Sequence, residues 1–286
     1  MTIKGRILCS LAVCLIVLAG LHITLAQPLF ALTFTTIDVP GSQSTEASAI
    51  NNRGLIIGDY TDAAGGFHGF LLDNGEFTTI DVPGATQTSP SGINDRGQIV
   101  GFDYVGGFHG FLFDNGAFTT IDVPGATHTL AIGINHRGQI VGYYTDAGGV
   151  LHGFLLDNGA FTTIDPPGAT GTQAAGINDR GQIVGTYAGA GGTGGGFLLD
   201  KGTFTTINVP GATDSRADAI NNGGQIAGGY TDATDFHGYR LTDGDFITID
   251  VPGAATFTFP LGINNRGQVV GGYDDAGGSQ HGFVAR

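Results

Sequence analysis

The sequence predicts an all-β protein, a six-bladed β-propeller, and three observations support this fold. A motif with the sequence Gly-Ile-Asn-Asp-Arg-Gly-Gln-Ile-Val-Gly at residues 92–101 occurs in six versions along the chain. A second motif, Phe-Thr-Thr-Ile-Asp-Val-Pro-Gly, recurs at intervals of 43, 41, 43, 43 and 42 residues, the period of a four-stranded propeller blade. No segment has the 3.6-residue periodicity of an amphipathic helix.

The chain begins with a segment typical of a secretory signal peptide, residues 1–26. Lys4 and Arg6 precede an apolar run, and small residues offer cleavage positions after Ala19 and Ala26. An uncleaved membrane anchor is the alternative, because the apolar run approaches the length of a membrane-spanning helix. Residues 27–33 form a short lead-in, and residues 34–286 form a single propeller domain. In both cases the repeats are expected to be secreted or periplasmic.

Each repeat of ~43 residues is expected to supply four antiparallel strands. In the second repeat these are residues 91–94, 98–103, 109–113 and 118–123. The segments 94–97 and 114–116 have tight-turn chemistry, so they join the first strand to the second and the third to the fourth. The polar loop after Pro124 has no such chemistry and is expected to cross to the next blade. The first strand then lies innermost, where small residues such as Gly92 fit the crowded axis.

The two ends of the domain predict how the ring closes. The repeats open with an outer-type strand, residues 34–39, and end after a third-type strand, residues 281–284. The last blade therefore lacks its outer strand, and the first strand lacks a blade. Pairing these two strands closes the ring and covers two sheet edges that would otherwise favour aggregation.

The charge and the cysteines exclude several classes of function. The formal net charge is −14, and removing Lys4 and Arg6 leaves 9 basic and 25 acidic residues, a charge of −16. Such a protein repels phosphate, so nucleic acid and anionic membrane surfaces are not expected as partners, whereas neutral sugars are compatible. Both cysteines, Cys9 and Cys14, lie in the signal segment, so the mature chain has no disulfide and no thiol nucleophile.

The order of the motifs resembles a known family. Gly-Ile-Asn-x-x-Gly-Gln-Ile-Val-Gly followed by His-Gly-Phe-Leu is similar to the bacterial extracellular HAF repeat family, named for its His-Ala-Phe tripeptide. The resemblance extends from Phe34 to Arg286, with glycine in place of the alanine. It implies a bacterial secreted or cell-envelope protein, and it implies no established enzymatic activity or ligand.

Polar residues that recur in the repeats are expected to be structural. A shared metal site among the histidines is excluded by distance, because equivalent residues of a sixfold ring lie more than ~10 Å apart, whereas zinc ligands lie within ~2.1 Å of one ion. Each histidine is therefore expected to form a hydrogen bond within its own blade. The asparagines that open the inner turns and the aspartates before the crossing loops are expected to be turn formers. The recurring histidines are His68, His109, His152, His237 and His281.

No cofactor and no metal site are predicted. The Thr-Asp-Ala loops that begin at Thr61, Thr145 and Thr231 offer oxygen ligands for weak Ca²⁺ binding, and turn chemistry explains these loops equally well.

The candidate binding residues lie on one face of the predicted propeller. Crossing loops and loops between the second and third strands emerge on the same side, the long-loop face, and vary most between repeats. Variable loops on a rigid scaffold are where binding usually occurs. The chain has no tryptophan, so tyrosines would have to provide the flat surfaces on which sugars stack. The predicted binding residues are Asp214, Arg216, Phe257, Phe259, His128, Tyr144 and Tyr230.

No catalytic motif accompanies these residues. The chain has no Gly-x-Ser-x-Gly elbow, no His-Glu-x-x-His, no phosphate loop and no complete calcium loop. A glycosidase needs two facing carboxylates, and nothing in the sequence singles out a pair. We therefore expect a secreted, monomeric, non-catalytic propeller that binds an extracellular protein or glycan. The alternatives are a hydrolase or lyase acting on a polysaccharide, which clustered once-only acids would favour, and a purely structural cell-envelope protein.

Overall fold

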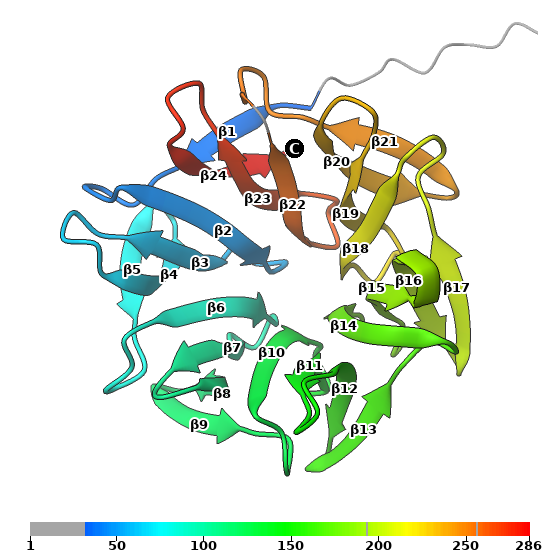
Figure 1. Ribbon diagram of the computed structural model, residues 1–286. Coiled ribbons are helices and arrows are strands. Elements are labelled where there is room, and N and C mark those ends of the chain that lie inside the picture. The colour runs from blue at the N-terminus through cyan, green and yellow to red at the C-terminus, as the bar shows by residue number, and fades with distance from the viewer. Residues whose placement is uncertain (1–31, 193, 256) are drawn as a thin grey trace, which may run out of the picture. The chain divides into compact units, whose positions relative to one another are not determined.

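The protein is a six-bladed β-propeller, as the sequence predicts. The computed structural model describes residues 32–192, 194–255 and 257–286. Its strands form six antiparallel sheets of four strands, which are arranged around a common centre (Figure 1). In these ranges the one helical element is the 3₁₀ turn η1 (Ala190–Gly192), and no helix there is long and apolar enough to cross a membrane. The predicted signal segment lies outside the described residues.

The blades follow one another in chain order. Blade 1 contains β2 (Ser44–Ile50), β3 (Ile56–Thr61), β4 (Phe67–Asp73) and β5 (Glu76–Ile80). Blade 2 contains β6 (Thr88–Ile93), β7 (Ile99–Tyr104), β8 (Phe108–Asp114) and β9 (Ala117–Ile121). Blade 3 contains β10 (His128–Ile134), β11 (Ile140–Thr145), β12 (Leu151–Asp157) and β13 (Ala160–Ile164).

The second half repeats this order. Blade 4 contains β14 (Ala169–Ile177), β15 (Ile183–Gly189), β16 (Gly194–Asp200) and β17 (Thr203–Ile207). Blade 5 contains β18 (Asp214–Ile220), β19 (Ile226–Thr231), β20 (Phe236–Thr242) and β21 (Asp245–Ile249). Blade 6 contains β22 (Thr258–Ile263), β23 (Val269–Asp274) and β24 (Gln280–Ala285), and β1 (Phe34–Ile37) completes it.

Strand order agrees with the prediction, whereas some strand ends differ. The inner strand β6 begins at Thr88, three residues before the predicted start, although Pro90 lies within it. Proline is compatible with this strand because its unpaired edge faces the centre of the ring. The outer strand β9 ends at Ile121, because the Val123 carbonyl accepts a turn hydrogen bond from the Ala126 N–H (3.0 Å).

Both predicted tight turns are present. In the inner turn of blade 2 the Gly97 N–H donates to the Asn94 carbonyl (3.0 Å), and Gly97 has a φ of +83°. In the outer turn Asn115 and Gly116 have φ values of +49° and +82°, the positive pair that a type I′ hairpin turn requires. These turns lie at one end of every blade, which we call the tight-turn face. The longer loops lie at the long-loop face.

The ring closes between the two ends of the domain, also as predicted. Strand β1 pairs with β24, with Phe34 opposite Ala285 and Ile37 opposite Gly282. Thr33 and Arg286 extend this ladder through two backbone hydrogen bonds of 2.9 Å.

The apolar core lies between neighbouring blades. Val100 of blade 2, for example, belongs to one buried cluster with Ile134 and Phe154 of blade 3. The inner strands come so close that a Cβ added to Gly92 would lie 2.5 Å from the Ile132 carbonyl oxygen. The predicted need for small residues at the axis is therefore confirmed.

Candidate functional site

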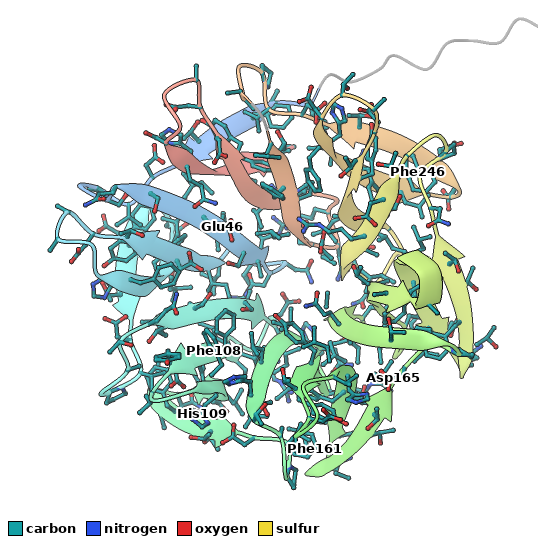
Figure 2. The ribbon with its side chains drawn as sticks, in the orientation of Figure 1. Glu46, Phe108, His109, Phe161, Asp165 and Phe246 are labelled. Atoms are coloured by element: carbon teal, nitrogen blue, oxygen red, sulfur yellow. The ribbon has the colours of Figure 1, made fainter. Side chains whose placement is uncertain are left out.

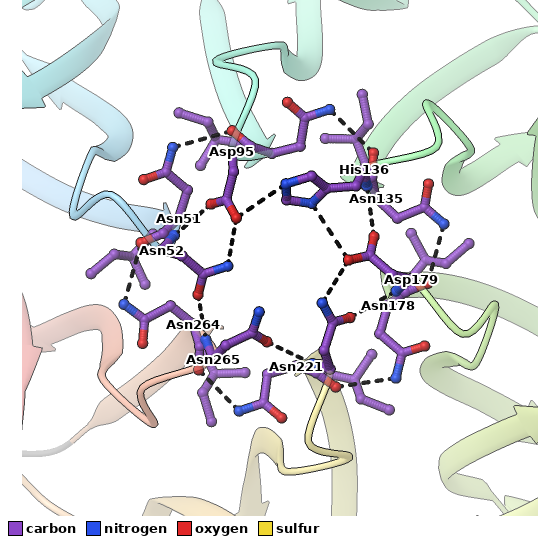
Figure 3. A pocket seen from close by; sticks show the side chains of 18 residues that line it. Asn51, Asn52, Asp95, Asn135, His136, Asn178, Asp179, Asn221, Asn264 and Asn265 are labelled. Carbon is purple, nitrogen blue, oxygen red and sulfur yellow. Dashed lines mark hydrogen bonds and ion pairs between the residues drawn. The ribbon is translucent and has the colours of Figure 1, made fainter.

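A ring of six buried asparagines joins the blades at the tight-turn end of the central channel. The Asn94 Oδ1 accepts the backbone N–H groups of Arg96 (3.0 Å) and Gln98 (3.1 Å), which confirms its predicted role in the turn. Its Nδ2 also donates to the Asn135 carbonyl of the next blade (3.1 Å), a contact that the sequence reasoning missed. The equivalent cross-blade bond occurs in every blade (Figure 3). The six residues are Asn51, Asn94, Asn135, Asn178, Asn221 and Asn264.

The residues that follow these asparagines form a second polar ring, and it contains a once-only histidine. The His136 Nε2 lies 3.1 Å from Asp95 Oδ2, and its Nδ1 lies 3.5 Å from Asp179 Oδ2 (Figure 3). Asn52 and Asn222 each donate a side-chain hydrogen bond of 2.6 Å to one of these carboxylates. Because each acid is already paired with neighbouring blades, this end of the channel is best explained as a structural closure.

At the long-loop end of the channel the six repeats are not alike. One aligned position of the inner strands has no common residue. The residue before it is always threonine or serine and is buried, as in Thr45 and Ser215. The position itself carries a different side chain in each blade. Figure 2 shows its blade 1 member, Glu46, on the inner strand β2. The six residues are Glu46, Ser89, Leu130, Gln173, Arg216 and Phe259.

Three of the predicted binding residues meet at this end, between blades 5 and 6. The Arg216 guanidinium carbon lies 4.9 Å from the ring centre of Phe236 and 5.2 Å from that of Phe259. Phe259 in turn stacks on Phe257, with ring centres 5.4 Å apart, and Phe257 is 39% exposed. We call these four residues the Arg216 group. It combines a cation held on aromatic faces with an aromatic surface open to solvent.

The backbone of Gly229 makes this arrangement possible. A Cβ at Gly229 would collide with the Phe236 ring. On the other side of the group, Arg216 Nε lies 3.2 Å from Asp218 Oδ2, and the Arg216 carbonyl accepts the Tyr239 hydroxyl (2.9 Å). Asp218 therefore holds the guanidinium on one side and the two phenylalanine rings hold it on the other, whereas Tyr239 fixes the backbone of Arg216.

A pair of acids lies at the same end of blade 1. Glu46 and Asp59 are directly opposite each other in the ladder between β2 and β3. Ser89 Oγ donates to Asp59 Oδ2 (2.8 Å), and Gln280 Nε2 donates to Glu46 Oε2 (2.9 Å). Burial raises the pKa of Asp59 to about 8, and the charge of Glu46 adds to this rise. Burial also raises the pKa of Glu46, although the charge of Arg216 opposes the rise.

The sequence reasoning missed this pair because it overlooked Asp59. The signal was present, because Asp59 is the only acid at its aligned position in the six repeats. The residue at this position differs from repeat to repeat, and only glycine occurs there twice. The other five residues there are Phe102, Tyr143, Thr186, Gly229 and Gly272.

The remaining predicted binding residues lie elsewhere. His128 Nδ1 accepts the Phe108 N–H (3.3 Å) between blades 2 and 3. Asp214 lines a separate hollow beside blade 4. Tyr144 and Tyr230 each stack on a histidine of their own blade at 5.2 Å. The structure thus brings Arg216, Phe257 and Phe259 together and leaves these four apart.

The predicted histidine hydrogen bonds within blades are confirmed. His68 Nδ1 lies 2.8 Å from Asp81 Oδ2, and this hydrogen bond raises the pKa of His68 despite some burial. His109, His152, His237 and His281 have the equivalent partner. The aspartates predicted to be turn formers are therefore histidine partners. The signal was their constant spacing of 13 residues from the histidines along the chain. In blade 6 the pair is His281 and Asp38, which come from the two ends of the domain.

The loop aspartates of the suggested calcium sites are also engaged. Asp62 Oδ1 accepts the N–H groups of Ala64 (2.8 Å) and Gly66 (2.7 Å), and its Oδ2 lies 3.4 Å from His68 Nε2. Among the residues that the structure describes, no three His, Cys, Asp or Glu side chains converge as metal ligands.

Comparison with known proteins yields the fold alone. No protein-family model matches the chain, and no curated protein sequence matches it. AofleA from Arthrobotrys oligospora is 14% identical, with 89% of this chain and 86% of that chain covered and a TM-score of 0.56. The lectin of Aleuria aurantia, solved with Fucα1-6GlcNAc, is 13% identical over 87% and 93%, with a TM-score of 0.53. A gluconolactonase from Xanthomonas campestris is 12% identical over 92% of both chains, with a TM-score of 0.54.

Proposed function

We propose that the chain is a secreted, non-catalytic binding module of the HAF repeat type, and that it binds a glycan through the Arg216 group. The observation that carries this proposal is the position at which the six repeats differ in sequence. At the aligned inner-strand position no two blades agree, and Arg216 and Phe259 occupy it in adjacent blades. A binding function needs such residues once, whereas a scaffold function would repeat them.

The chemistry of the group suits a neutral saccharide. The exposed ring of Phe257 offers a flat apolar surface against which the C–H face of a sugar packs. The guanidinium of Arg216 supplies several N–H donors for hydroxyl oxygens. A net charge of −14 favours a neutral glycan over an anionic one.

The comparisons support a binding propeller without identifying its ligand. One similar structure is a lectin solved with a fucosylated disaccharide, and another is a gluconolactonase. Both are too distant in sequence for their ligands to be transferred. We expect a monomer, because β1 covers the edge of β24 that would otherwise pair with another chain.

The test is a glycan array probed with the secreted chain, followed by titration calorimetry. α-Methyl-L-fucoside serves as the defined first probe, together with the best array ligand. The variants Arg216→Ala and Phe257→Ala should each weaken binding by tenfold or more, about 1.4 kcal/mol or more. The matched control is Arg180→Ala, which removes an exposed arginine from the tight-turn face. Equal binding by Arg216→Ala, Phe257→Ala and Arg180→Ala would show that the ligand lies elsewhere.

The acid pair favours a second candidate function, a polysaccharide hydrolase. Asp59, with its pKa near 8, would be protonated at neutral pH and would suit a general acid, with Glu46 close by. Both carboxyls already accept hydrogen bonds within the protein, which is why we favour binding. Release of reducing sugar from array-positive oligosaccharides, abolished by Asp59→Asn, would establish the hydrolase. Binding without turnover would exclude it for those ligands.

A further inference from the structure

Four blades share a unit that includes a tyrosine, a histidine and two aspartates. In blade 1 the Tyr60 ring lies 5.3 Å from the His68 ring, and the two histidine nitrogens face Asp81 and Asp62. The tyrosine hydroxyl also bonds to a threonine of the outer strand, Thr79, at 3.2 Å. Blades 3, 5 and 6 repeat these contacts around Tyr144, Tyr230 and Tyr273. Both the ring and the hydroxyl of each tyrosine are thus engaged.

Blade 4 keeps the tyrosine, Tyr187, and the outer-strand threonine, Thr206, but lacks the histidine and both aspartates. Opposite Tyr187 in the ladder lies Gly195 instead of histidine. Asn208 replaces the aspartate after the outer strand, and residues 188–194 contain no loop aspartate. Within the part of the chain that the structure describes, the Tyr187 ring has no aromatic neighbour and its hydroxyl has no hydrogen bond. This half-buried tyrosine therefore presents a ring face and a hydroxyl that its counterparts use internally.

Tyr187 lines a hollow on the long-loop side of blade 4. The hollow has a volume of about 400 Å³, within the usual range for small-ligand sites. Leu151 of blade 3, Gln173 and Thr186 of blade 4 and Asp214 of blade 5 complete its wall. Gly192 and Gly194 also line the hollow and contribute no side chain to it. Blades 3, 4 and 5 are neighbours in the ring (Figure 1), and each contributes residues to this hollow.

These side chains define a class of ligand. The tyrosine ring and Leu151 offer apolar contact, whereas Gln173 supplies an amide and Asp214 a carboxylate that accepts hydrogen bonds from hydroxyl groups. An anionic ligand would be repelled by Asp214 in a chain that carries a net charge of −14. We propose that the blade 4 hollow binds one neutral, hexose-sized saccharide residue. This site is separate from the Arg216 group, because the Arg216 side chain leans towards Phe259 of blade 6.

The experiment uses the whole secreted chain and four sugars as probes: D-glucose, D-galactose, D-mannose and N-acetyl-D-glucosamine. Saturation-transfer NMR detects contact, and titration calorimetry measures affinity. Tyr187→Ala should weaken the affinity for the sugar at least tenfold. The matched control, Tyr144→Ala, removes the equivalent ring of blade 3 and should leave affinity within twofold of the original chain, because that ring is covered by His152.

A second variant fills the hollow without removing Tyr187. Residues 145–152 of blade 3 and residues 188–195 of blade 4 are segments of equal length at the same place in the repeat. Replacing the latter with Thr-Asp-Ala-Gly-Gly-Val-Leu-His, together with Asn208→Asp, rebuilds the tyrosine–histidine–aspartate unit. This chimera should lose sugar binding and keep or raise its melting temperature.

The outcomes separate the two proposed sites. Binding that is lost in Tyr187→Ala and in the chimera, and retained in Arg216→Ala, supports the blade 4 site. Binding that is lost only in Arg216→Ala supports the proposed function and overturns this inference. Absence of binding by all four sugars, or equal binding by the chimera and the original chain, overturns it as well.

Discussion

Blade 4 also contains a buried hydroxyl that has lost its partner, and this allows a matched test of the packing. In the other five blades a buried hydroxyl accepts the backbone N–H of the valine before the crossing loop. In blade 3, for example, Val123 N–H donates to Thr129 Oγ1 at 3.0 Å. In blade 4 the position of this valine is occupied by Pro166, which has no N–H. Thr172 is 1% exposed, and its Oγ1 has no hydrogen-bond partner.

The same substitution should therefore have opposite effects at these two positions. Thr129→Val removes the acceptor and leaves the Val123 N–H without its partner, which costs about 1–3 kcal/mol. Thr172→Val removes a hydroxyl that is already unpaired, so its effect should lie between zero and about 1 kcal/mol of stabilisation. For a chain of this size each kcal/mol corresponds to roughly 2–4 °C of melting temperature. The two variants should then differ by about 4–8 °C, given a difference near 2 kcal/mol.

Thermal and urea denaturation measure the stability of both variants. The double variant Pro166→Val, Thr172→Val completes a cycle with Pro166→Val alone. Valine at position 166 supplies the missing N–H, so in that background Thr172→Val should become costly. The reasoning is refuted if Thr172→Val costs as much as Thr129→Val in the original chain, because the Thr172 hydroxyl must then have a partner.

Four further predictions concern pH, the asparagine ring, ring closure and calcium. Asp59, whose folded pKa is about 8, and His68, whose pKa is raised above 6.5, both bind protons more tightly when folded. The contribution of each group to stability is complete below its unfolded pKa, which is 3.8 for Asp59, and is lost as pH rises through its folded pKa. The melting temperature should therefore fall between about pH 4 and pH 8, and Asp59→Asn should flatten the fall. Asn94→Ala leaves two backbone N–H groups and a carbonyl of the next blade without partners. It should lower the free energy of unfolding by roughly 3–5 kcal/mol in urea denaturation, whereas the exposed control Arg96→Ala should change it by less than about 0.5 kcal/mol. Removing residues 27–38 deletes β1 and should produce higher oligomers in size-exclusion chromatography than the original chain forms, because the edge of β24 becomes free. An unchanged elution volume would contradict this role of β1. Calcium chloride at millimolar concentration should leave the melting temperature unchanged because Asp62 already accepts two backbone N–H groups, and a rise of several degrees would reveal a metal site.

The fold was predictable because its causes are local and repeated. A turn such as 94–97 shows its chemistry in every repeat, and the split outer strand at the two ends predicts the pairing of β1 with β24. The Asn94 turn cap was also predictable from residue type. The cross-blade bond from Asn94 to the Asn135 carbonyl was not, because it depends on how closely two inner turns approach.

The candidate site was predictable only in part. Arg216, Phe257 and Phe259 stand out because they break the repeat, and the structure brings them together. Asp214 breaks the repeat as well, yet it lines another hollow together with residues of blades 3 and 4, whereas the Arg216 guanidinium packs on Phe236 and Phe259. Residue type does not distinguish these two surroundings. Residue type alone predicts a binding role for Tyr144. Its ring is stacked on His152, a contact that only the ladder register reveals.

The departures of blade 4 are physically linked, and this supports treating them as one feature. Without a histidine at position 195, an aspartate at position 208 would lose its hydrogen-bond partner and keep its charge. Asparagine at position 208 removes that charge, and a loop without aspartate removes the second one. Blade 2 gives the contrast, because it lacks the tyrosine but keeps the pair of His109 and Asp122. Unrelated drift would leave such half-broken units in several blades. A blade that loses both acids and the histidine, and keeps only the aromatic ring beside an open hollow, is what a binding site made from a structural unit should look like.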